Sequence, residues 1–319
     1  MKKYLPLICN LVAAVIFGFA MLFMKTGMRV VGQDTVKFLA FRFTVGFITL
    51  NLLLLFKLQK VCYKGKPLGL LLLCGALNPL ISQVLETSST TYAPTAQIAV
   101  FMSLVPILVV VFSVFINKER PSRRQIFFML VSILGVFVIN FVGGQMHGGT
   151  AAGMALILSA MLVISLGRVF VRRASASFTP FETIYITTGM GSVGFTLATV
   201  FSHAAKGALN RFFSGLWTAD FIVSVLYMGI ASCVIAFLCL TYATGNLPIA
   251  VSASTGTLST VISILVGVFI LGERFRVIDI VGAVIILGGI VGMSLSYEPH
   301  AGKLGSAADK SDQKEALHQ

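Results

Sequence analysis

Long apolar segments follow one another along nearly the whole chain, and polar residues gather in the short stretches between them. A transmembrane helix needs about 20 mostly apolar residues. Because the apolar residues are continuous and do not alternate with polar ones, the strands of a membrane barrel are excluded. Backbone groups in lipid then favour helices. We predict ten transmembrane helices, at about residues 5–24, 38–56, 68–87, 95–116, 125–142, 151–171, 180–202, 219–240, 247–271 and 278–295.

The composition agrees with a chain that lies almost wholly in a lipid bilayer. Hydrophobic residues make up 57% of the sequence, charged residues 11%, and the mean hydropathy is +0.95. A soluble domain carries roughly a quarter charged residues. Ten spans occupy roughly 200 residues, which leaves no room for a separate soluble domain. The predicted fold class is therefore all-α, a polytopic membrane protein.

The basic residues lie at the ends of apolar segments, which is not the pattern of a nucleic-acid-binding surface. With the N-terminus inside, the inside segments hold 16 of the 24 Lys and Arg residues and the outside segments hold 7. Positive charge is enriched on the cytoplasmic side. We expect both termini in the cytoplasm and the protein in the plasma membrane, the inner membrane of a bacterium. The apolar run Leu5–Met24 after Met1-Lys2-Lys3 resembles a signal peptide, but it is long for one and no Ala-x-Ala cleavage site follows, so we interpret it as a retained first span.

An internal repeat relates the two halves of the chain. A shift of 154 places residues 94–142 on 248–296 without a gap and brings Glu119–Arg120 onto Glu273–Arg274. Five spans per half is an odd number, so the second half enters the membrane upside down. Inverted repeats place a solute site near the midplane between the halves and permit alternating access. The predicted units are a first repeat at 1–145, a second repeat at 146–296 and a disordered cytoplasmic tail at 297–319.

A proline in the fourth span stands thirteen residues before a turn, and a Gly-rich span follows. Pro106 and Glu119 have this spacing, and Leu271–Arg274 reads Leu-Gly-Glu-Arg. With this pattern the chain resembles the drug/metabolite transporter superfamily, and within it the EamA-like family. Asn117–Lys118 and Thr260 depart from the family pattern. The resemblance implies ten helices around a central cavity and export of small metabolites, often amino acids. It says almost nothing about the particular substrate.

Enzyme motifs are absent from the sequence. The four histidines lie in predicted loops or in the tail, and neither His-Glu-x-x-His nor a Walker A motif occurs. The five cysteines form no Cys-x-x-Cys pair and are interpreted as buried thiols. We expect no catalytic residue, no metal and no cofactor. Transport would use a gradient, with H+ as a candidate coupling ion, or proceed by facilitated flow.

Polar side chains inside spans are costly and are candidates for function. The third span carries the densest set, Asn78, Ser82, Gln83 and Glu86. The spacing of Asn78, Ser82 and Glu86 predicts one helix face, which would line a wet cavity. Glu86 then binds a substrate amine or a proton. The alternative is a solvated or structurally paired carboxylate near the outer boundary.

Three basic residues are possible charge partners. Arg42 lies inside the second span, where it needs a partner or water. A pair with Glu86, a structural pair and snorkelling to the interface are the alternatives. Lys25 and Arg168 lie near the ends of the first and sixth spans. Each either contacts a carboxylate or anchors the end of its helix.

The fourth and ninth spans correspond in the repeat, and both contain polar residues. In the ninth span, Ser254 and Thr257 bind a solute or allow close helix packing. The fourth span, its counterpart, carries Gln97 and Ser103. Tyr242 precedes the ninth span, where it gates the cavity or belongs to an interfacial belt.

Two further features concern the backbone of the spans. Pro106 lies mid-span, removes a helix hydrogen bond and predicts a kink that is a candidate hinge. Gly288 and Gly292 form a Gly-x-x-x-Gly face, which packs inside the protein or against a second copy in a homodimer.

The leading hypothesis is a secondary transporter that exports a small polar metabolite, such as an amino acid, across the bilayer by alternating access. The alternatives are a flippase for lipids or lipid-linked sugars and a membrane receptor or assembly subunit without flux.

Overall fold

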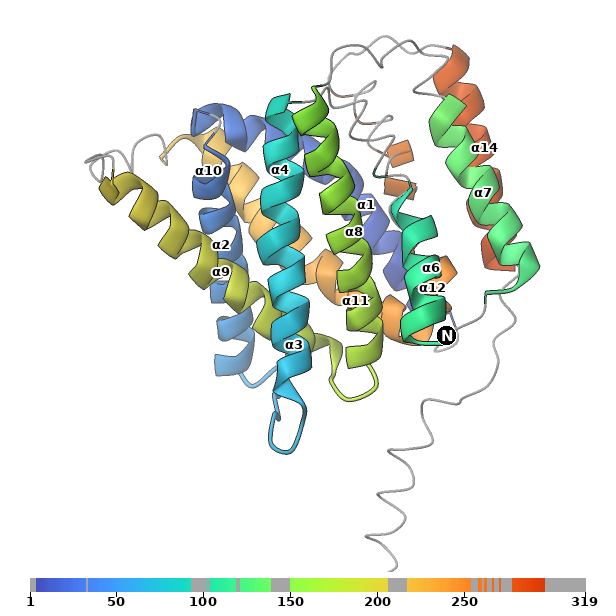
Figure 1. The fold of residues 1–319 in the computed structure, drawn as a ribbon. Coiled ribbons are helices and arrows are strands. Elements are labelled where there is room, and N and C mark those ends of the chain that lie inside the picture. Colours follow the sequence, from blue (N-terminus) through green and yellow to red (C-terminus); the bar gives the residue numbers. More distant parts are fainter. Residues whose placement is uncertain are drawn as a thin grey trace, which may run out of the picture.

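The computed structural model is a bundle of helices, many of them antiparallel neighbours (Figure 1). The structure describes residues 4–32, 34–92, 102, 104–118, 121–138, 150–205, 217–253, 258–259, 261–262, 266, 270 and 277–295. Every regular element in these ranges is helical, as the apolar segments predict. The elements are α1 (Leu5–Val30), α2 (Thr35–Leu55), α3 (Leu68–Gly75), η1 (Ala76–Ile81), α4 (Ser82–Tyr92), α6 (Val105–Ile116), α7 (Arg123–Phe137), α8 (Ala151–Ala174), α9 (Pro180–Ala205), α10 (Ala219–Leu226), η4 (Tyr227–Ala236), α11 (Phe237–Asn246), α12 (Ile249–Ala253) and α14 (Val277–Leu295).

Six helical stretches in the described ranges are long and apolar enough to cross a membrane. Val105–Ile116 and Ile280–Gly292 are shorter apolar helices. The chain is therefore an integral membrane protein built from helices. The count of ten spans stays a prediction, of which the six stretches correspond to the first three and to the sixth, seventh and eighth. The six stretches are Leu5–Val30, Thr35–Leu55, Leu68–Glu86, Ala151–Ala174, Pro180–Ala205 and Ala219–Asn246.

Side-chain caps fix where several helices begin. The Asp34 carboxylate accepts a hydrogen bond from Lys37 N at 3.0 Å before α2. Ser122 and Gln125 form a capping box at the start of α7. Thr150 Oγ1 accepts from Gly153 N at 3.1 Å before α8. Each cap supplies an acceptor to an N–H group of the first turn that has no partner within the helix, and so fixes the residue at which the helix begins.

Two helical stretches contain wide, π-type turns. The first runs from α3 through η1 to α4, and Asn78 within it has a non-helical backbone, with φ −139° and ψ 111°. The second runs from α10 through η4 to α11. The prediction that Asn78, Ser82 and Glu86 share one regular helix face is therefore wrong, because the helix is interrupted at Asn78. Ser82 is also fully buried and lines no wet surface.

Helices of the two halves pack on each other reciprocally. In the first half, α4 belongs to the third span, and it packs along α8, the first span of the second half. In the second half, η4 and α11 belong to the third span, and they pack along α1, the first span of the first half. The two most extensive contacts between described helices join α2 to α9 and α7 to α14. Figure 1 shows α4 beside α8 and α7 beside α14.

Glycines allow α7 and α14 to approach closely. A Cβ at Gly289 would lie 2.6 Å from Ser132 N and 2.7 Å from Phe128 O, two backbone atoms of α7. A Cβ at Gly288 would meet nothing within 4 Å. The predicted Gly288–Gly292 face is therefore wrong within this chain, because Gly292 faces Phe128 whereas Gly288 is exposed.

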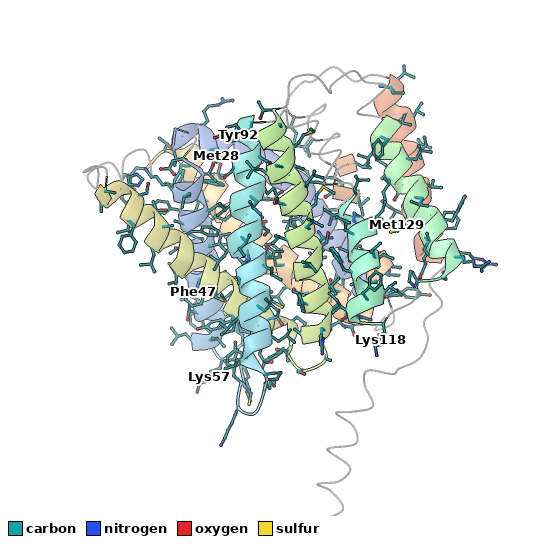
Figure 2. All side chains as sticks on the ribbon, viewed as in Figure 1. Met28, Phe47, Lys57, Tyr92, Lys118 and Met129 are labelled. Atoms are coloured by element: carbon teal, nitrogen blue, oxygen red, sulfur yellow. The ribbon has the colours of Figure 1, made fainter. Side chains whose placement is uncertain are left out.

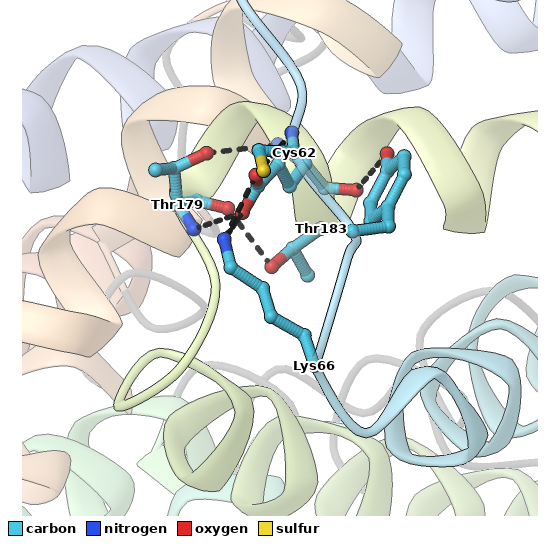
Figure 3. A network of polar contacts seen from close by, with 6 residues as sticks. Cys62, Lys66, Thr179 and Thr183 are labelled. Carbon is cyan, nitrogen blue, oxygen red and sulfur yellow. Dashed lines mark hydrogen bonds and ion pairs between the residues drawn. The ribbon is translucent and has the colours of Figure 1, made fainter.

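An ion pair joins the connection between α2 and α3 to the start of α9 (Figure 3). Lys66 Nζ lies 2.9 Å from Glu182 Oε1 and 2.7 Å from Glu182 Oε2. The backbone N–H groups of Cys62 and Thr179 donate to the same carboxylate at 2.8 Å and 2.9 Å. Tyr63 Oη donates to the Glu182 carbonyl at 3.3 Å. Burial, with the nearby Glu182 charge, raises the pKa of Tyr63 to about 12, so the phenol stays protonated at neutral pH.

Replacing Gly289 by Ala should destabilise the α7–α14 contact, because the new methyl group would meet backbone atoms that cannot rotate away. Overpacking of this kind costs about 1–3 kcal/mol. We expect a lower unfolding temperature for detergent-solubilised Gly289→Ala, measured at one fixed heating rate. Gly288→Ala is the matched control and should unfold like the wild type. Equal unfolding temperatures for the two variants would contradict this packing.

Replacing Glu182 by Gln should weaken the link between the α2–α3 connection and α9, because the buried acceptor of Lys66 loses its charge. We expect a cost of about 1–3 kcal/mol, typical of a charged hydrogen bond. Lys66→Met should lower the unfolding temperature by a similar amount. In the double variant, the unfolding temperature should fall by less than the sum of the two single decreases. Additive losses would show that Lys66 and Glu182 act independently. Lys64→Met, at an exposed neighbouring lysine, serves as the control.

Candidate functional site

A cluster of charged and polar side chains lies inside the bundle, where α2, α4, α8 and η4 meet. It contains Arg42 from α2, Gln83 and Glu86 from α4, and Arg168 from α8. Ser232 and Cys233 of η4 complete it. The cluster therefore joins side chains from both halves of the chain.

Arg42 is held by neutral partners. Its Nε donates to Cys233 Sγ at 3.2 Å, its Nη1 to Gln83 Oε1 at 3.3 Å and its Nη2 to Ser232 Oγ at 3.2 Å. The guanidinium also lies 5.3 Å from the centre of the Phe43 ring. Only 6% of Arg42 is exposed, and a buried guanidinium is costly unless its donors find acceptors. The fold therefore fixes Arg42 as a bridge between α2, α4 and η4.

Glu86 lies one step further along the same chain of hydrogen bonds. Gln83 Nε2 donates to Glu86 Oε2 at 3.2 Å, so the Gln83 amide connects Arg42 to the carboxylate. Gln83 and Glu86 are both partly exposed. The predicted pair of Arg42 with Glu86 thus takes the form of an electrostatic interaction relayed by Gln83.

Arg168 approaches Glu86 from the opposite direction. Tyr92, where α4 ends, accepts a backbone hydrogen bond from Thr150, just before α8 begins, so the two helices run antiparallel. Side chains lean toward the N-terminus of their own helix. The carboxylate of Glu86 and the guanidinium of Arg168 therefore lean toward each other, and the two groups interact electrostatically.

The interruption at Asn78 brings η1 against α8 beside Arg168. A Cβ at Gly167 would lie 3.2 Å from Asn78 Cβ, so only a small residue fits there. Asn78 Oδ1 accepts from Ser82 Oγ at 3.1 Å. The side chains of Asn78 and Ser82 thus brace the backbone next to the cluster, and Ser82 has no exposed surface.

The remaining predicted site residues lie elsewhere. Tyr242 is in α11, where its carbonyl accepts from Asn246 Nδ2 at 2.8 Å near the helix end. Pro106 lies in the first turn of α6, where its missing N–H group breaks no helical hydrogen bond. The predicted mid-helix kink at Pro106 is therefore replaced by a helix start. Lys25 belongs to α1, but its side chain lies outside the described structure, and Gln97, Ser103, Ser254 and Thr257 lie outside the described residues.

Sequence reasoning missed Ser232 and Cys233. The repeat contains a signal for one of them, because position 232 lies 154 residues after Asn78. The same shift places Gln83 on Phe237 and Glu86 on Leu240, two apolar residues. The second half therefore supplies a hydroxyl and a thiol to the cluster through η4, and no charge from the positions that match Gln83 and Glu86.

A polar contact between α2 and α9 was also missed. Thr44 Oγ1 lies 3.1 Å from Ser192 Oγ and 3.2 Å from Thr196 Oγ1. Hydroxyls that bond across helices hold transmembrane segments together. Single Thr and Ser residues inside apolar segments give no such signal, because their partners are known only after the helices are paired.

The cluster is suited to binding a charged solute. In the described residues, no group of three or more His, Cys, Asp or Glu side chains could hold a metal ion. Guanidinium, amide, carboxylate and hydroxyl groups instead offer donors and acceptors to a small polar molecule. Three residues of the cluster are partly exposed and therefore accessible: Gln83, Glu86 and Arg168.

The chain is similar to known transporters in sequence and to a solved structure in fold. The model of the EamA-like transporter family matches residues 5–141 and 151–295. The uncharacterized transporter YcxC of Bacillus subtilis is 25% identical over 296 residues, which cover 92% of this chain and 94% of YcxC. The probable terminal-alkyne amino-acid exporter of Streptantibioticus cattleyicolor is 24% identical over 228 residues, covering 72% and 73%. A solved crystal structure has a similar fold, with a TM-score of 0.73, 18% identity, and coverage of 92% and 99%.

These relatives are named as transporters and not as enzymes, in agreement with the helical membrane fold and the absence of enzyme motifs. The family model covers most of the chain in its two matches. The protein therefore belongs to the EamA-like transporter family.

Proposed function

We propose that the protein is a secondary transporter that exports a small polar metabolite, with amino acids as the leading substrate class. One observation carries the proposal. A connected set of charged and polar groups, Arg42, Gln83, Glu86 and Ser232, lies between the two halves with Arg168 beside it. Ionisable residues within transmembrane helices commonly mark a substrate or ion pathway.

Helix ends that correspond at the 154-residue shift support an inverted repeat and, with it, alternating access. The start of α14 at Val277 lies 154 residues after the start of α7 at Arg123, and the end of α11 at Asn246 lies 154 residues after the end of α4 at Tyr92. The same shift places η1 inside η4. Corresponding irregular helices in two halves are a pointer to the binding site of a transporter. Reciprocal packing of α4 on α8 and of α11 on α1 agrees with a two-fold relation.

The substrate class is supported by the relative from Streptantibioticus cattleyicolor, whose name describes amino-acid export. An amino acid carries an ammonium and a carboxylate group. Glu86 offers a negative partner and Arg168 a positive one, and both remain partly exposed.

The distribution of charge supports cytoplasmic termini in the plasma membrane. Figure 2 places Lys57 and Lys118 at one end of the bundle, and Tyr92 and Met28 at the other. The N-terminus lies at the end that carries the two lysines (Figure 1). Lysines flanking transmembrane segments favour the cytoplasmic side, so the solute would enter from that end and leave at the end of Tyr92.

The transport step would exchange contacts within the cluster. Glu86 receives one hydrogen bond from Gln83, and Gln83 in turn receives one from Arg42. A proton or a substrate ammonium at Glu86 would weaken the attraction of its carboxylate to the two arginines. Helices of one half would then be free to rock against those of the other, with H+ as the coupling ion.

The first test measures flux of labelled amino acids into and out of liposomes that contain the purified protein. We expect Glu86→Gln to reduce transport about tenfold or more, or to remove its response to a pH gradient, because the amide neither takes up a proton nor pairs with an ammonium. Asp220→Asn, at an exposed residue of α10, should transport like the wild type. Unchanged flux and unchanged pH response in Glu86→Gln would exclude Glu86 from the mechanism.

A further inference from the structure

The cluster holds more positive than negative groups. Among its described members, two guanidinium groups, Arg42 and Arg168, face a single carboxylate, Glu86. If Glu86 binds a proton, the excess of positive charge becomes larger. Charges inside a membrane protein are normally balanced by a partner. The described members of the cluster therefore lack a balancing negative group in either protonation state of Glu86.

Arg42 is not the arginine that awaits this partner. Its three donor nitrogens are directed at Cys233, Gln83 and Ser232, and the residue is almost fully buried. A solute could reach the Arg42 guanidinium only after these contacts were broken. Arg42 therefore serves to position Gln83 and η4.

Arg168 has the opposite character. Arg168 is partly exposed although it lies six residues inside the end of α8. It makes no hydrogen bond to any residue that the structure describes, and its interaction with Glu86 is electrostatic. A guanidinium presents five donors in a planar fork that matches a carboxylate. Within the described part of the chain, Arg168 is thus a charged donor beside the cluster whose N–H groups have no acceptor.

The backbone around Arg168 holds the residue in this position. Gly167 packs against Asn78 of η1, and the buried Ser165 Oγ donates to the Met161 carbonyl at 2.6 Å. About one turn after Arg168, Arg172 Nη1 donates to the carbonyls of Thr244 and Gly245, both at 2.6 Å, and ties α8 to α11. Arg172 therefore has a structural role, whereas no described residue accepts a hydrogen bond from Arg168.

We propose that Arg168 binds the carboxylate of the transported solute, so that a carboxylate is the obligatory group of the substrate and an ammonium is not. This inference rests on the proposed function and narrows its substrate class to small organic acids, amino acids included. The carboxylate supplies the negative charge that the cluster lacks. Glu86 is the resting counter-ion of Arg168, and the solute carboxylate replaces it there.

The experiment compares compounds that share one carbon skeleton. Liposomes that contain the purified wild-type protein are first loaded with each of the twenty common amino acids in labelled form. The amino acid that is transported best is then chosen. Four unlabelled analogues then compete for its transport: the amino acid itself, its 2-hydroxy acid, its amino alcohol and its amide. We expect the two acids to compete at similar concentrations, and the amino alcohol and amide to need about tenfold more or to fail, as for the loss of a charge-assisted hydrogen bond.

Variants assign this selectivity to one side chain. Arg168→Gln should bind the acids about tenfold or more weakly, measured by the shift in unfolding temperature that each acid produces. Arg168→Lys keeps the charge without the planar fork and should retain part of that shift. Arg173→Gln, at an exposed arginine of the same helix, is the matched control and should behave like the wild type. The unfolding temperature without solute shows whether each variant is folded.

The outcomes separate this inference from the proposed function. Competition by the amide or the amino alcohol as strong as that of the acids would overturn the carboxylate requirement while leaving transport in place. Undiminished binding of the acids to folded Arg168→Gln would overturn the role of Arg168. Chloride or inorganic phosphate that protects the protein as well as the acids do would show a general anion site instead. If wild-type protein moves no member of the panel, the proposed function fails and this inference fails with it.

Discussion

Desolvation of Arg42 is the constraint around which the site is organised. A guanidinium in the interior of a transmembrane helix bundle must find acceptors within the protein, because lipid supplies none. The fold meets this need with Gln83 from one neighbouring segment and with Ser232 and Cys233 from another. The same three contacts bring α4 and η4 to α2, so that satisfying one charge assembles side chains from both halves of the chain.

Irregular backbone occurs where the cluster needs it. η1 and η4 are wide turns, and both lie in stretches that would otherwise be plain apolar helices. Such turns are tolerated inside a membrane protein where other helices cover them, and they are frequent at functional sites. η4 presents Ser232 and Cys233 to Arg42, and η1 presents Asn78 to the backbone beside Arg168. The reciprocal packing of the two halves supplies the covering helices in both cases.

Much of this arrangement could be predicted from the sequence, because hydropathy and intramembrane charge are local properties. The apolar segments locate the helices, and Arg42, Gln83, Glu86 and Arg168 are conspicuous as polar residues within them. The break at Asn78 could not be predicted from spacing, since the regular i, i+4 pattern hides it. Ser82 illustrates the same limit, because its hydroxyl bonds to Asn78 inside the helix and not to a cavity. Ser232 and Cys233 depend on how distant helices pair, which no local pattern contains.

The unequal polarity of the two halves has a consequence for the transport cycle. Gln83 and Glu86 correspond to Phe237 and Leu240, so the charged part of the third span has an apolar counterpart. If the two inverted halves were identical, a two-fold rotation would relate the inward-open and outward-open states, and the two states would have equal energy. In the proposed alternating-access cycle, Gln83 and Glu86 would face the two sides of the membrane in turn, and the matching positions Phe237 and Leu240 would contribute no equivalent charge. The resting protein should therefore favour one orientation, and the membrane potential should influence which one.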